Sequence, residues 1–303
     1  MRERERVLLI DIDSKIPNLA LMKVSAYHKA LGDTVGFDTA DPTRAYISCI
    51  FKKNKAKADS AATMLKLQYP EISIDIGGPG YSLTKVLPDE IEGQRPDYDL
   101  YPGTDYSLGF TTRGCIRRCP FCIVPVKEGN FHRVARVEDI HDPRHRQIKL
   151  LDNNVLADMD NFRRIVEYCK EHDLKLDVSQ GLDARLFTEE AAGLLASIRP
   201  MSTWTFAFDS MAYRPAVERA IGLLRDAGIN LRRIVQFYVY CDDSDGEYGI
   251  ESAIERCRLL KGWNTNPWVM LNIDRTPTKA MRHLKRWANQ KQIFWTIDIS
   301  EYK

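Results

Sequence analysis

The sequence has no apolar run long enough to cross a membrane and no signal-peptide core near its start. Its longest stretch without a charged residue, Gly262–Ile273, still contains Asn, Thr and Pro, whereas a membrane-spanning helix needs about 20 mostly apolar residues. The charged start Met1–Arg6 leads into Val7–Ile10, which is typical of a strand rather than of a leader. We therefore expect a cytoplasmic protein without a membrane partner.

Repeats, low-complexity tracts and a large excess of one charge are also absent. Hydrophobic residues make up 44% of the 303 residues and charged residues 28%, which excludes a disordered or collagenous chain. The 44 Lys and Arg residues nearly balance the 42 Asp and Glu residues. Positive charge is in excess only over residues 113–149, where 9 basic residues face 4 acidic ones. This segment would attract a nucleic acid, or balance a negatively charged site nearby.

Cysteine is scarce and unevenly distributed. In a reducing compartment, clustered thiols are metal ligands or redox groups more often than disulfides. Three of the seven cysteines, Cys115, Cys119 and Cys122, lie within one short segment. The others are scattered among apolar neighbours, where we expect structural thiols; they are Cys49, Cys169, Cys241 and Cys257. The short segment therefore predicts a metal or iron–sulfur site.

The three clustered cysteines suit one kind of iron–sulfur site in particular. Their thiolates can bind three irons on one face of a cubane [4Fe–4S] cluster, whereas a cluster held entirely by protein uses four cysteines. The remaining iron then stays open to a small molecule. The alternative is a structural zinc site, which takes four ligands and would need a further one such as His132.

The first hundred residues alternate short apolar strands with helices, which predicts a doubly wound, Rossmann-like α/β domain. The expected strands are 6–12, 45–51 and 72–76, and the expected helices are 18–31 and a Lys- and Ala-rich helix that ends near residue 68. From Leu87 to Asp105 the chain is rich in Pro, Asp, Gly and Tyr. We place the domain boundary there, so that residues 1–105 form the first domain and residues 106–303 the second.

The second domain continues this alternation with greater regularity. Its expected strands are 107–113, 148–152, 175–180, 203–209, 233–240, 268–273 and 293–298, and its expected helices are 160–172, 188–198, 215–227, 250–260 and 278–289. These units predict a partial (β/α)6 barrel of the TIM type. In such folds the chemistry lies at the carboxyl ends of the strands, and the cysteine segment follows the first of them.

The sequence Cys115-x3-Cys119-x2-Cys122, with Phe121 directly before the last cysteine, resembles the signature of the radical S-adenosylmethionine (SAM) superfamily. The resemblance implies that SAM chelates the open iron through its amino and carboxylate groups. Reductive cleavage of SAM would then give methionine and a 5′-deoxyadenosyl radical, which abstracts hydrogen from a substrate. Phe121 would lie against the adenine, and the reductant would be a flavodoxin or a ferredoxin.

The resemblance also assigns Asp152, Asn153 and Asn154 to SAM. They follow the second expected strand, where the family binds the amino group of SAM, although its commoner Gly-Gly-Glu sequence is absent here. Asp and Asn oxygens are suitable acceptors for an ammonium group. The competing interpretation of each residue is a helix cap or an ion pair.

After the third expected strand, Gln180, Asp183 and Arg185 resemble the segment that contacts the ribose and the methionine carboxylate of SAM. Arg185 would donate a forked pair of hydrogen bonds to that carboxylate. Asp183 or Gln180 would accept hydrogen bonds from the ribose hydroxyls. Here too, a helix cap or an ion pair is the competing interpretation.

An α/β domain followed by this barrel resembles radical SAM proteins with a cobalamin-binding-type N-terminal domain. That domain has similar short sequence segments, to which we compare Val7–Ile10, Ile16–Leu21 and Ile76–Gly80. The Asp-x-His-x-x-Gly sequence that supplies a lower histidine ligand is missing, and His28, the one histidine before the cysteines, is expected at the surface of a helix. Relatives without this histidine also bind cobalamin. Cobalamin binding and a degenerate docking domain therefore both stay open.

We thus expect a radical SAM enzyme, and the alternative is a non-catalytic iron–sulfur electron carrier or sensor. The sequence holds no substrate motif, so the substrate is left as a small molecule, a peptide or a nucleic acid. Methyl transfer, rearrangement and bond formation are all open. Arg113, Arg117 and Arg118 would balance the negative charge of the cluster and of SAM. We favour this local explanation of the basic segment over a nucleic-acid partner.

Overall fold

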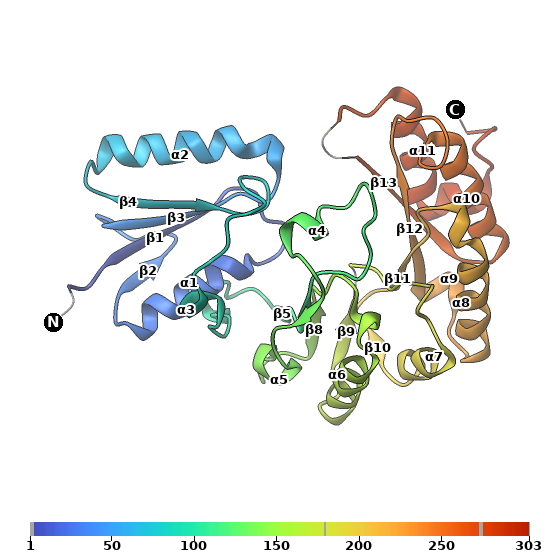
Figure 1. Ribbon diagram of the computed structural model, residues 1–303, viewed down its shortest axis with the longest axis horizontal. Coiled ribbons are helices and arrows are strands. Elements are labelled where there is room, and N and C mark those ends of the chain that lie inside the picture. Colours follow the sequence, from blue (N-terminus) through green and yellow to red (C-terminus); the bar gives the residue numbers. More distant parts are fainter. Residues whose placement is uncertain (1–2, 179, 273–274, 303) are drawn as a thin grey trace. The chain divides into compact units, whose positions relative to one another are not determined.

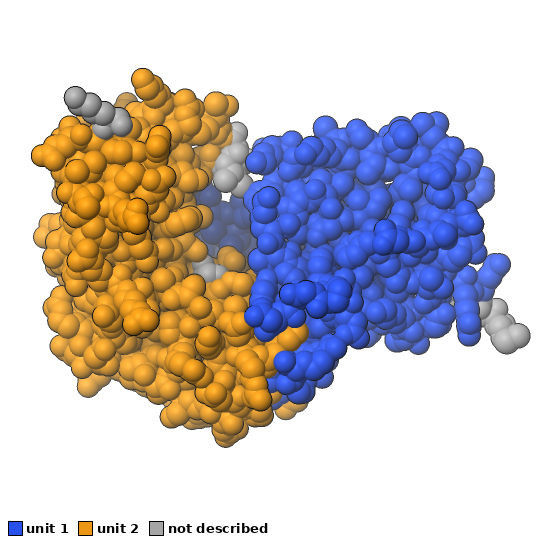
Figure 2. Space-filling model, turned by 180° about the vertical axis from the view of Figure 1, so that it is seen from behind, with its two compact units in different colours: residues 1–109, 117–130, 138–144 blue, residues 110–116, 131–137, 145–303 orange. Residues whose placement is uncertain are grey.

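The computed structural model describes residues 3–178, 180–272 and 275–302. It is an α/β structure with parallel sheets, which confirms the predicted fold class at that level. The chain divides into two compact units, which Figure 2 colours separately. Unit 1 comprises residues 1–109, 117–130 and 138–144, and unit 2 comprises residues 110–116, 131–137 and 145–303. Three segments that the sequence places in the second domain, 106–109, 117–130 and 138–144, therefore belong to unit 1.

Unit 1 contains a parallel sheet with the strand order β2-β1-β3-β4. The strands are β1 (Arg6–Asp11), β2 (Thr34–Gly36), β3 (Arg44–Ser48) and β4 (Ser73–Gly77). The helices α1 (Leu19–Ala30) and α2 (Lys55–Gln68) lie on opposite faces of the sheet (Figure 1). This arrangement is consistent with a Rossmann-like domain.

Each face of this sheet has its own apolar cluster. Val7 of β1 and Leu21 of α1 lie in one cluster, and Ile47 of β3 and Ala58 of α2 lie in the other. Burying such an aliphatic side chain contributes about 1.5–3 kcal/mol. α1 begins at Asn18, whose side chain accepts a hydrogen bond from the backbone N–H of Leu21 at 3.1 Å. The strand period and the helix cap together explain why the predicted elements form here.

The turn after β4 packs against the backbone of its own unit. Gly78 has a φ of +93°, and a Cβ at this position would lie 2.3 Å from the carbonyl oxygen of Cys49. A Cβ at Gly80 would lie 2.5 Å from the carbonyl carbon of Phe51. These two glycines are therefore required for the close approach of two chain segments.

Unit 2 contains two groups of parallel strands. They are β8 (Gln147–Leu150), β9 (Lys175–Asp177) and β10 (Arg199–Pro200), and β11 (Trp204–Ala207), β12 (Val235–Cys241) and β13 (Asn266–Leu271). A bridge between Leu182 and Phe206 joins the segment after β9 to β11. A specific barrel stays a prediction.

Five of the helices in unit 2 agree with the expected ones. They are α6 (Met159–Glu171), α7 (Glu189–Ala196), α8 (Arg214–Asp226), α10 (Ile250–Gly262) and α11 (Lys279–Asn289). The side chain of Thr188 caps α7 by accepting a hydrogen bond from Ala191 N at 3.2 Å. Across the described residues, no helix combines the length and the apolar character needed to cross a membrane.

Several short elements were not expected from the sequence. They are β2 and β10, whose bounds are given above, and β5 (Ser107–Gly109), β6 (Thr112–Arg113), β7 (His132–Arg133), α3 (Asp89–Glu92), α4 (Val124–Lys127), α5 (Val137–Ile140) and α9 (Leu231–Ile234). β5 and β6 replace the single strand expected over 107–113. The strands expected over 175–180 and 268–273 include Ser179 and Ile273, which lie outside the described residues.

The strand expected over 293–298 is wrong, because residues Lys291–Thr296 form the helix α12. Phe294 of this helix is buried, and its ring packs edge-on against Trp287 of α11 with the centroids 5.0 Å apart. The indole N–H of Trp287 donates to the carbonyl of Ile297 at 3.1 Å. A short apolar run of this kind does not distinguish a strand from a buried helix, and here packing on α11 decides.

Candidate functional site

The segment that carries the three clustered cysteines starts and ends at a two-stranded antiparallel ladder. β6 pairs with β7, and Arg113 lies opposite His132. Gly114, directly before the first cysteine, has a φ of +74°, a left-handed conformation that favours glycine. The ladder and this glycine together determine where the segment leaves the strand.

The clustered cysteines are partly exposed, and none of them forms a disulfide. Cys115 belongs to unit 2, whereas Cys119 and Cys122 belong to unit 1. Within unit 1, the backbone N–H of Cys122 donates to the carbonyl of Cys119 at 3.0 Å, which closes a turn around the partly exposed Phe121. Partly exposed thiols of this kind are suitable metal ligands. The cluster itself stays a prediction.

Asp152 lies after β8 and holds the strand that leads to the cysteines. Its Oδ1 accepts a hydrogen bond from Thr111 N at 2.7 Å, and its Oδ2 accepts from Thr111 Oγ1, Thr112 N and Thr112 Oγ1 at 2.5, 2.8 and 2.7 Å. Burial raises the pKa of Asp152, and these hydrogen bonds oppose the increase. Both carboxylate oxygens are thus engaged in fixing Thr111 and Thr112. The contact of Asp152 with SAM stays a prediction.

Asn153 and Asn154 bring the end of β8 against the first cysteine. Asn153 Oδ1 accepts a hydrogen bond from Gly114 N at 3.0 Å. Asn154 Nδ2 donates to Cys115 Sγ at 3.7 Å, while Asn154 Oδ1 is buried and has no hydrogen-bond partner within the described part of the chain. A buried oxygen without a donor is costly. This arrangement can therefore accept a ligand donor directly beside Cys115.

Asp183 and Arg185 form a bidentate ion pair after β9. Arg185 Nε and Nη2 donate to the two oxygens of Asp183 at 2.7 and 3.1 Å. The Arg185 guanidinium also lies over the Tyr213 ring, 4.1 Å from its centroid. Gln180 is exposed and close to this pair in sequence. The pair holds the guanidinium in one orientation, and its predicted contacts with SAM are untested.

Asp209, at the carboxyl end of β11, was not identified from the sequence. Its Oδ1 accepts a hydrogen bond from Tyr240 N at 2.9 Å. Burial raises its pKa to about 6, although Tyr240 N, Arg256 and Arg185 oppose the increase. A carboxyl group that titrates near neutral pH at this end of the strands can donate or accept a proton. The sequence feature that could have identified Asp209 is its position at the end of an expected strand.

Arg256 on α10 is another residue that the sequence did not indicate. Its side chain is fully buried, and it donates to the carbonyl oxygens of Phe208 at 3.0 Å, Tyr240 at 3.1 Å and Glu247 at 3.3 Å. These carbonyls belong to the chain segments at the carboxyl ends of β11 and β12. Arg256 therefore fixes the two strand ends relative to each other.

Lys149 of β8 and Asp177 of β9 form an ion pair between neighbouring strands. The two residues lie opposite each other in the ladder, and Lys149 Nζ donates to Asp177 Oδ2. Asp177 Oδ1 is buried and, among the described residues, has no hydrogen-bond partner. Burial and the negative charge of Asp177 raise the pKa of the nearby Tyr238. The pair was missed because it depends on strand register.

His28 is buried, which corrects the expectation that it lies on the surface of its helix. Its Nδ1 lies 2.7 Å from Asp33 Oδ2, and its Nε2 lies 3.2 Å from the hydroxyl of Tyr46. Glu5 completes a group whose ligand atoms lie within 4.8 Å of one another. Arg44 donates to both oxygens of Glu5 at 3.2 Å. The hydrogen bonds of His28 and the ion pair of Glu5 with Arg44 explain why these side chains lie close together. The group connects α1 to the start of β1.

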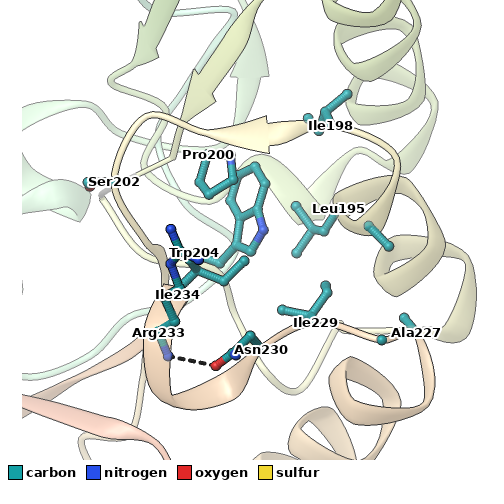
Figure 3. A pocket seen from close by; sticks show the side chains of 12 residues that line it. Leu195, Ile198, Pro200, Ser202, Trp204, Ala227, Ile229, Asn230, Arg233 and Ile234 are labelled. Atoms are coloured by element: carbon teal, nitrogen blue, oxygen red, sulfur yellow. Dashed lines mark hydrogen bonds between the residues drawn. The ribbon is translucent and has the colours of Figure 1, made fainter.

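A cavity of about 570 Å³ lies at the opposite end of the strands in unit 2. Figure 3 shows its wall, in which Leu195, Ile198 and Ile229 surround the indole of Trp204. Trp204 is the first residue of β11, so the cavity lies at the amino end of this strand. The predicted site residues instead follow the carboxyl ends of β8 and β9. The cavity is therefore separate from the candidate site.

No protein-family model matches the chain. The sequence is similar to the cytidylyl-2-hydroxyethylphosphonate methyltransferase of Streptomyces wedmorensis, with 27% identity over 168 residues. The similarity covers 53% of this chain and 30% of the methyltransferase. The chain thus matches less than a third of the length of this relative. An enzymatic function is consistent with this similarity.

Proposed function

We propose that the protein is a radical SAM enzyme in which Cys115, Cys119 and Cys122 hold a [4Fe–4S] cluster. The observation that carries the proposal is the position of Asn154, which donates to Cys115 Sγ and has a buried oxygen that receives no hydrogen bond from any described residue. The proposed architecture is a Rossmann-like domain followed by a partial (β/α)6 barrel. The parallel β/α units of both compact units support it.

The side chains beside Cys115 fit the proposed cofactors. A bound cluster supplies the electron that cleaves SAM into methionine and a 5′-deoxyadenosyl radical. The Asn154 amide stabilises the negative charge of the Cys115 thiolate, since hydrogen bonds to cluster sulfurs tune such sites. Asn154 Oδ1 would accept a hydrogen bond from the amino group of SAM. Asp152 holds Thr111 and Thr112 in place, and thereby supports the contacts of Asn154 with Cys115 and with SAM.

We further propose that the reaction is a methyl transfer to a substrate with a nucleotidyl group. Reductive cleavage leaves the methyl group of the first SAM on methionine, so a second SAM would supply the transferred methyl group and leave as S-adenosylhomocysteine. This proposal depends on the relative, whose name describes a methyltransferase acting on a cytidylyl phosphonate. The reductant is proposed to be a flavodoxin or a ferredoxin, because SAM cleavage needs one electron and the methyl transfer from the second SAM needs another. An electron carrier or sensor with the same cluster is the competing function.

Cobalamin carries no step in this proposal. The glycines at 77–80 resemble a cofactor-binding turn in sequence, but the space beside Gly78 and Gly80 is filled by the backbone at Cys49 and Phe51. The close approach of backbone segments within unit 1 therefore already explains why positions 78 and 80 are glycine. We therefore assign no residue of this turn to cobalamin.

The proposed function is tested by reconstituting the full chain with iron and sulfide under anaerobic conditions. Reduction in the presence of SAM should release 5′-deoxyadenosine, and Cys119→Ala should abolish both the iron and this product. Cys169→Ala is the matched control, because burial raises the pKa of Cys169 to about 12 and keeps it a thiol. A protein that holds zinc and no iron, or one that loads the cluster without cleaving SAM, would contradict the proposal.

A further inference from the structure

The strands β12 and β13 have one face that the helices leave uncovered. Tyr238 lies opposite Trp268 in the ladder, and Tyr240 lies opposite Met270. Their side chains alternate with Val239 and Val269, which are fully buried. Figure 1 shows α8, α10 and α11 on one side of these strands. We call the side chains of Tyr238, Tyr240, Trp268 and Met270 the β12–β13 face.

The β12–β13 face presents large apolar side chains to solvent. Trp268 is 42% exposed and Met270 is 44% exposed, whereas Val269 between them is 0% exposed. Tyr238 and Tyr240 are partly buried beside them. Exposed aromatic side chains next to one another are a stacking platform for planar rings, and a methionine beside them adapts to ring edges. The face is therefore suited to a flat, uncharged group.

A polar atom close to this face lacks a partner. Asp177 Oδ1 is buried, and no described residue donates a hydrogen bond to it. Asp177 is the last residue of β9, and the segment after β9 reaches Tyr238, since a Cβ at Gly181 would lie 3.7 Å from Tyr238 Cδ2. Tyr238 in turn adjoins Trp268 in the ladder. A ligand on the platform therefore gains most if it also carries an N–H or O–H group.

We propose that the β12–β13 face binds the nucleobase of the substrate, with its ring stacked on Trp268 and an amino or ring N–H donated to Asp177 Oδ1. Lys149 already neutralises the charge of Asp177, so the site presents no net charge to a ligand. We therefore propose a ligand ring without a net charge. A nucleobase combines a flat ring with N–H donors, whereas a purely apolar ring leaves Asp177 Oδ1 unpaired. This inference rests on the proposed function, because that function gives the substrate its nucleotidyl group.

The inference is tested by calorimetric titration of the full chain with cytidine, uridine, guanosine and adenosine. Trp268→Ala should weaken binding about 5- to 150-fold, since base–aromatic stacking is worth that much, whereas Trp268→Phe should stay within about tenfold of the original. Leu67→Ala is the control, because it removes another exposed apolar side chain, on α2 of unit 1. Melting temperatures should show that each variant is folded.

Asp177→Asn adds a readout that a purely structural role would not change. The amide would present N–H groups to the amino group of cytidine, so the affinity for cytidine should fall more than the affinity for uridine. Equal affinities of the original protein and of Trp268→Ala for every nucleoside would overturn the inference. So would binding of a tryptophan-containing tripeptide in place of the nucleosides, which would indicate a peptide substrate.

The same preparation separates this inference from the proposed function. Each protein sample is assayed for 5′-deoxyadenosine after reconstitution and for nucleoside binding. Nucleoside binding that depends on Trp268, without SAM cleavage, would support the nucleobase site and contradict the radical SAM proposal. SAM cleavage without nucleoside binding would contradict the nucleobase site alone.

Discussion

Asn154 and Cys115 are joined by a hydrogen bond in which the asparagine amide donates to the thiol sulfur at 3.7 Å. The amide oxygen of the same side chain, Oδ1, is buried, and none of the residues that the structure describes donates a hydrogen bond to it. One residue therefore contacts a proposed cluster ligand and offers an acceptor beside it. This double role makes Asn154 the most informative position for testing the site.

Replacing Asn154 with Ala should weaken SAM binding while the protein still loads iron. A hydrogen bond to a neutral amino group is worth about 0.5–1.5 kcal/mol, which corresponds to a Kd raised about 2- to 13-fold. Calorimetric titration of the reconstituted protein with SAM measures the effect. Asn230→Ala, which removes the cap of α9, is the control. An unchanged Kd in Asn154→Ala would remove Asn154 from the SAM site.

Asp209 should make the stability of the protein fall as the pH rises from about 4 to 6. Burial raises its pKa to about 6, so the unfolded chain loses this proton at a lower pH than the folded chain does. The contribution of Asp209 to the unfolding free energy is fully present below its pKa in the unfolded chain. This contribution is lost as the pH rises through its pKa in the folded chain. Asp209→Asn should remove on the order of 3 kcal/mol of this pH dependence of the unfolding free energy. Denaturant unfolding at several pH values checks it, and parallel curves for both proteins would contradict it.

Gly78→Ala should destabilise unit 1 strongly, whereas Gly77→Ala should not. The alanine Cβ at position 78 would meet the carbonyl oxygen of Cys49 at 2.3 Å, in a backbone with a φ of +93°. We expect a loss of at least about 3 kcal/mol in unfolding free energy. A Cβ at Gly77 meets nothing within 4 Å, so that variant should change by less than about 1 kcal/mol. Similar melting temperatures for the two variants would show that this contact is not tight.

Arg256→Met should destabilise unit 2 far more than Arg258→Met, although both residues lie on α10. Arg256 is fully buried, and its removal takes away the hydrogen bonds that it donates to the carbonyls of Phe208, Tyr240 and Glu247. The expected loss is at least about 3 kcal/mol. Arg258 forms an exposed ion pair with Asp298, which is worth about 0–1 kcal/mol. Thermal unfolding of both variants measures the difference, and equal losses would contradict the role given to Arg256.

The sequence predicts those parts of the fold that depend on local patterns. The caps Asn18 and Thr188 and the apolar period of β1 each mark an element that the structure contains. The same reasoning fails at residues 293–298, because Phe294 packs on Trp287, which belongs to another helix. Local sequence patterns do not show such a contact. It also misses β2, whose three residues are too few to show a period.

The site could be predicted only as far as its residue types. The polar residues after β8 were identified, but their partners Thr111 and Thr112 depend on how two strands lie side by side. The pair of Lys149 and Asp177 depends on strand register in the same way. Asp209 and the guanidinium of Arg256 meet through the backbone of β12, so no sequence spacing connects them.

The ladder of β6 and β7 has a consequence for how the cysteine segment tolerates change. The two ends of the segment are held by backbone pairs such as Arg113 with His132, whatever lies between them. Closing a longer loop costs little extra entropy, about 0.6 kcal/mol for each doubling of its length. Insertions between α4 and β7, or new chain termini placed there by circular permutation, should therefore leave the strands of unit 2 intact.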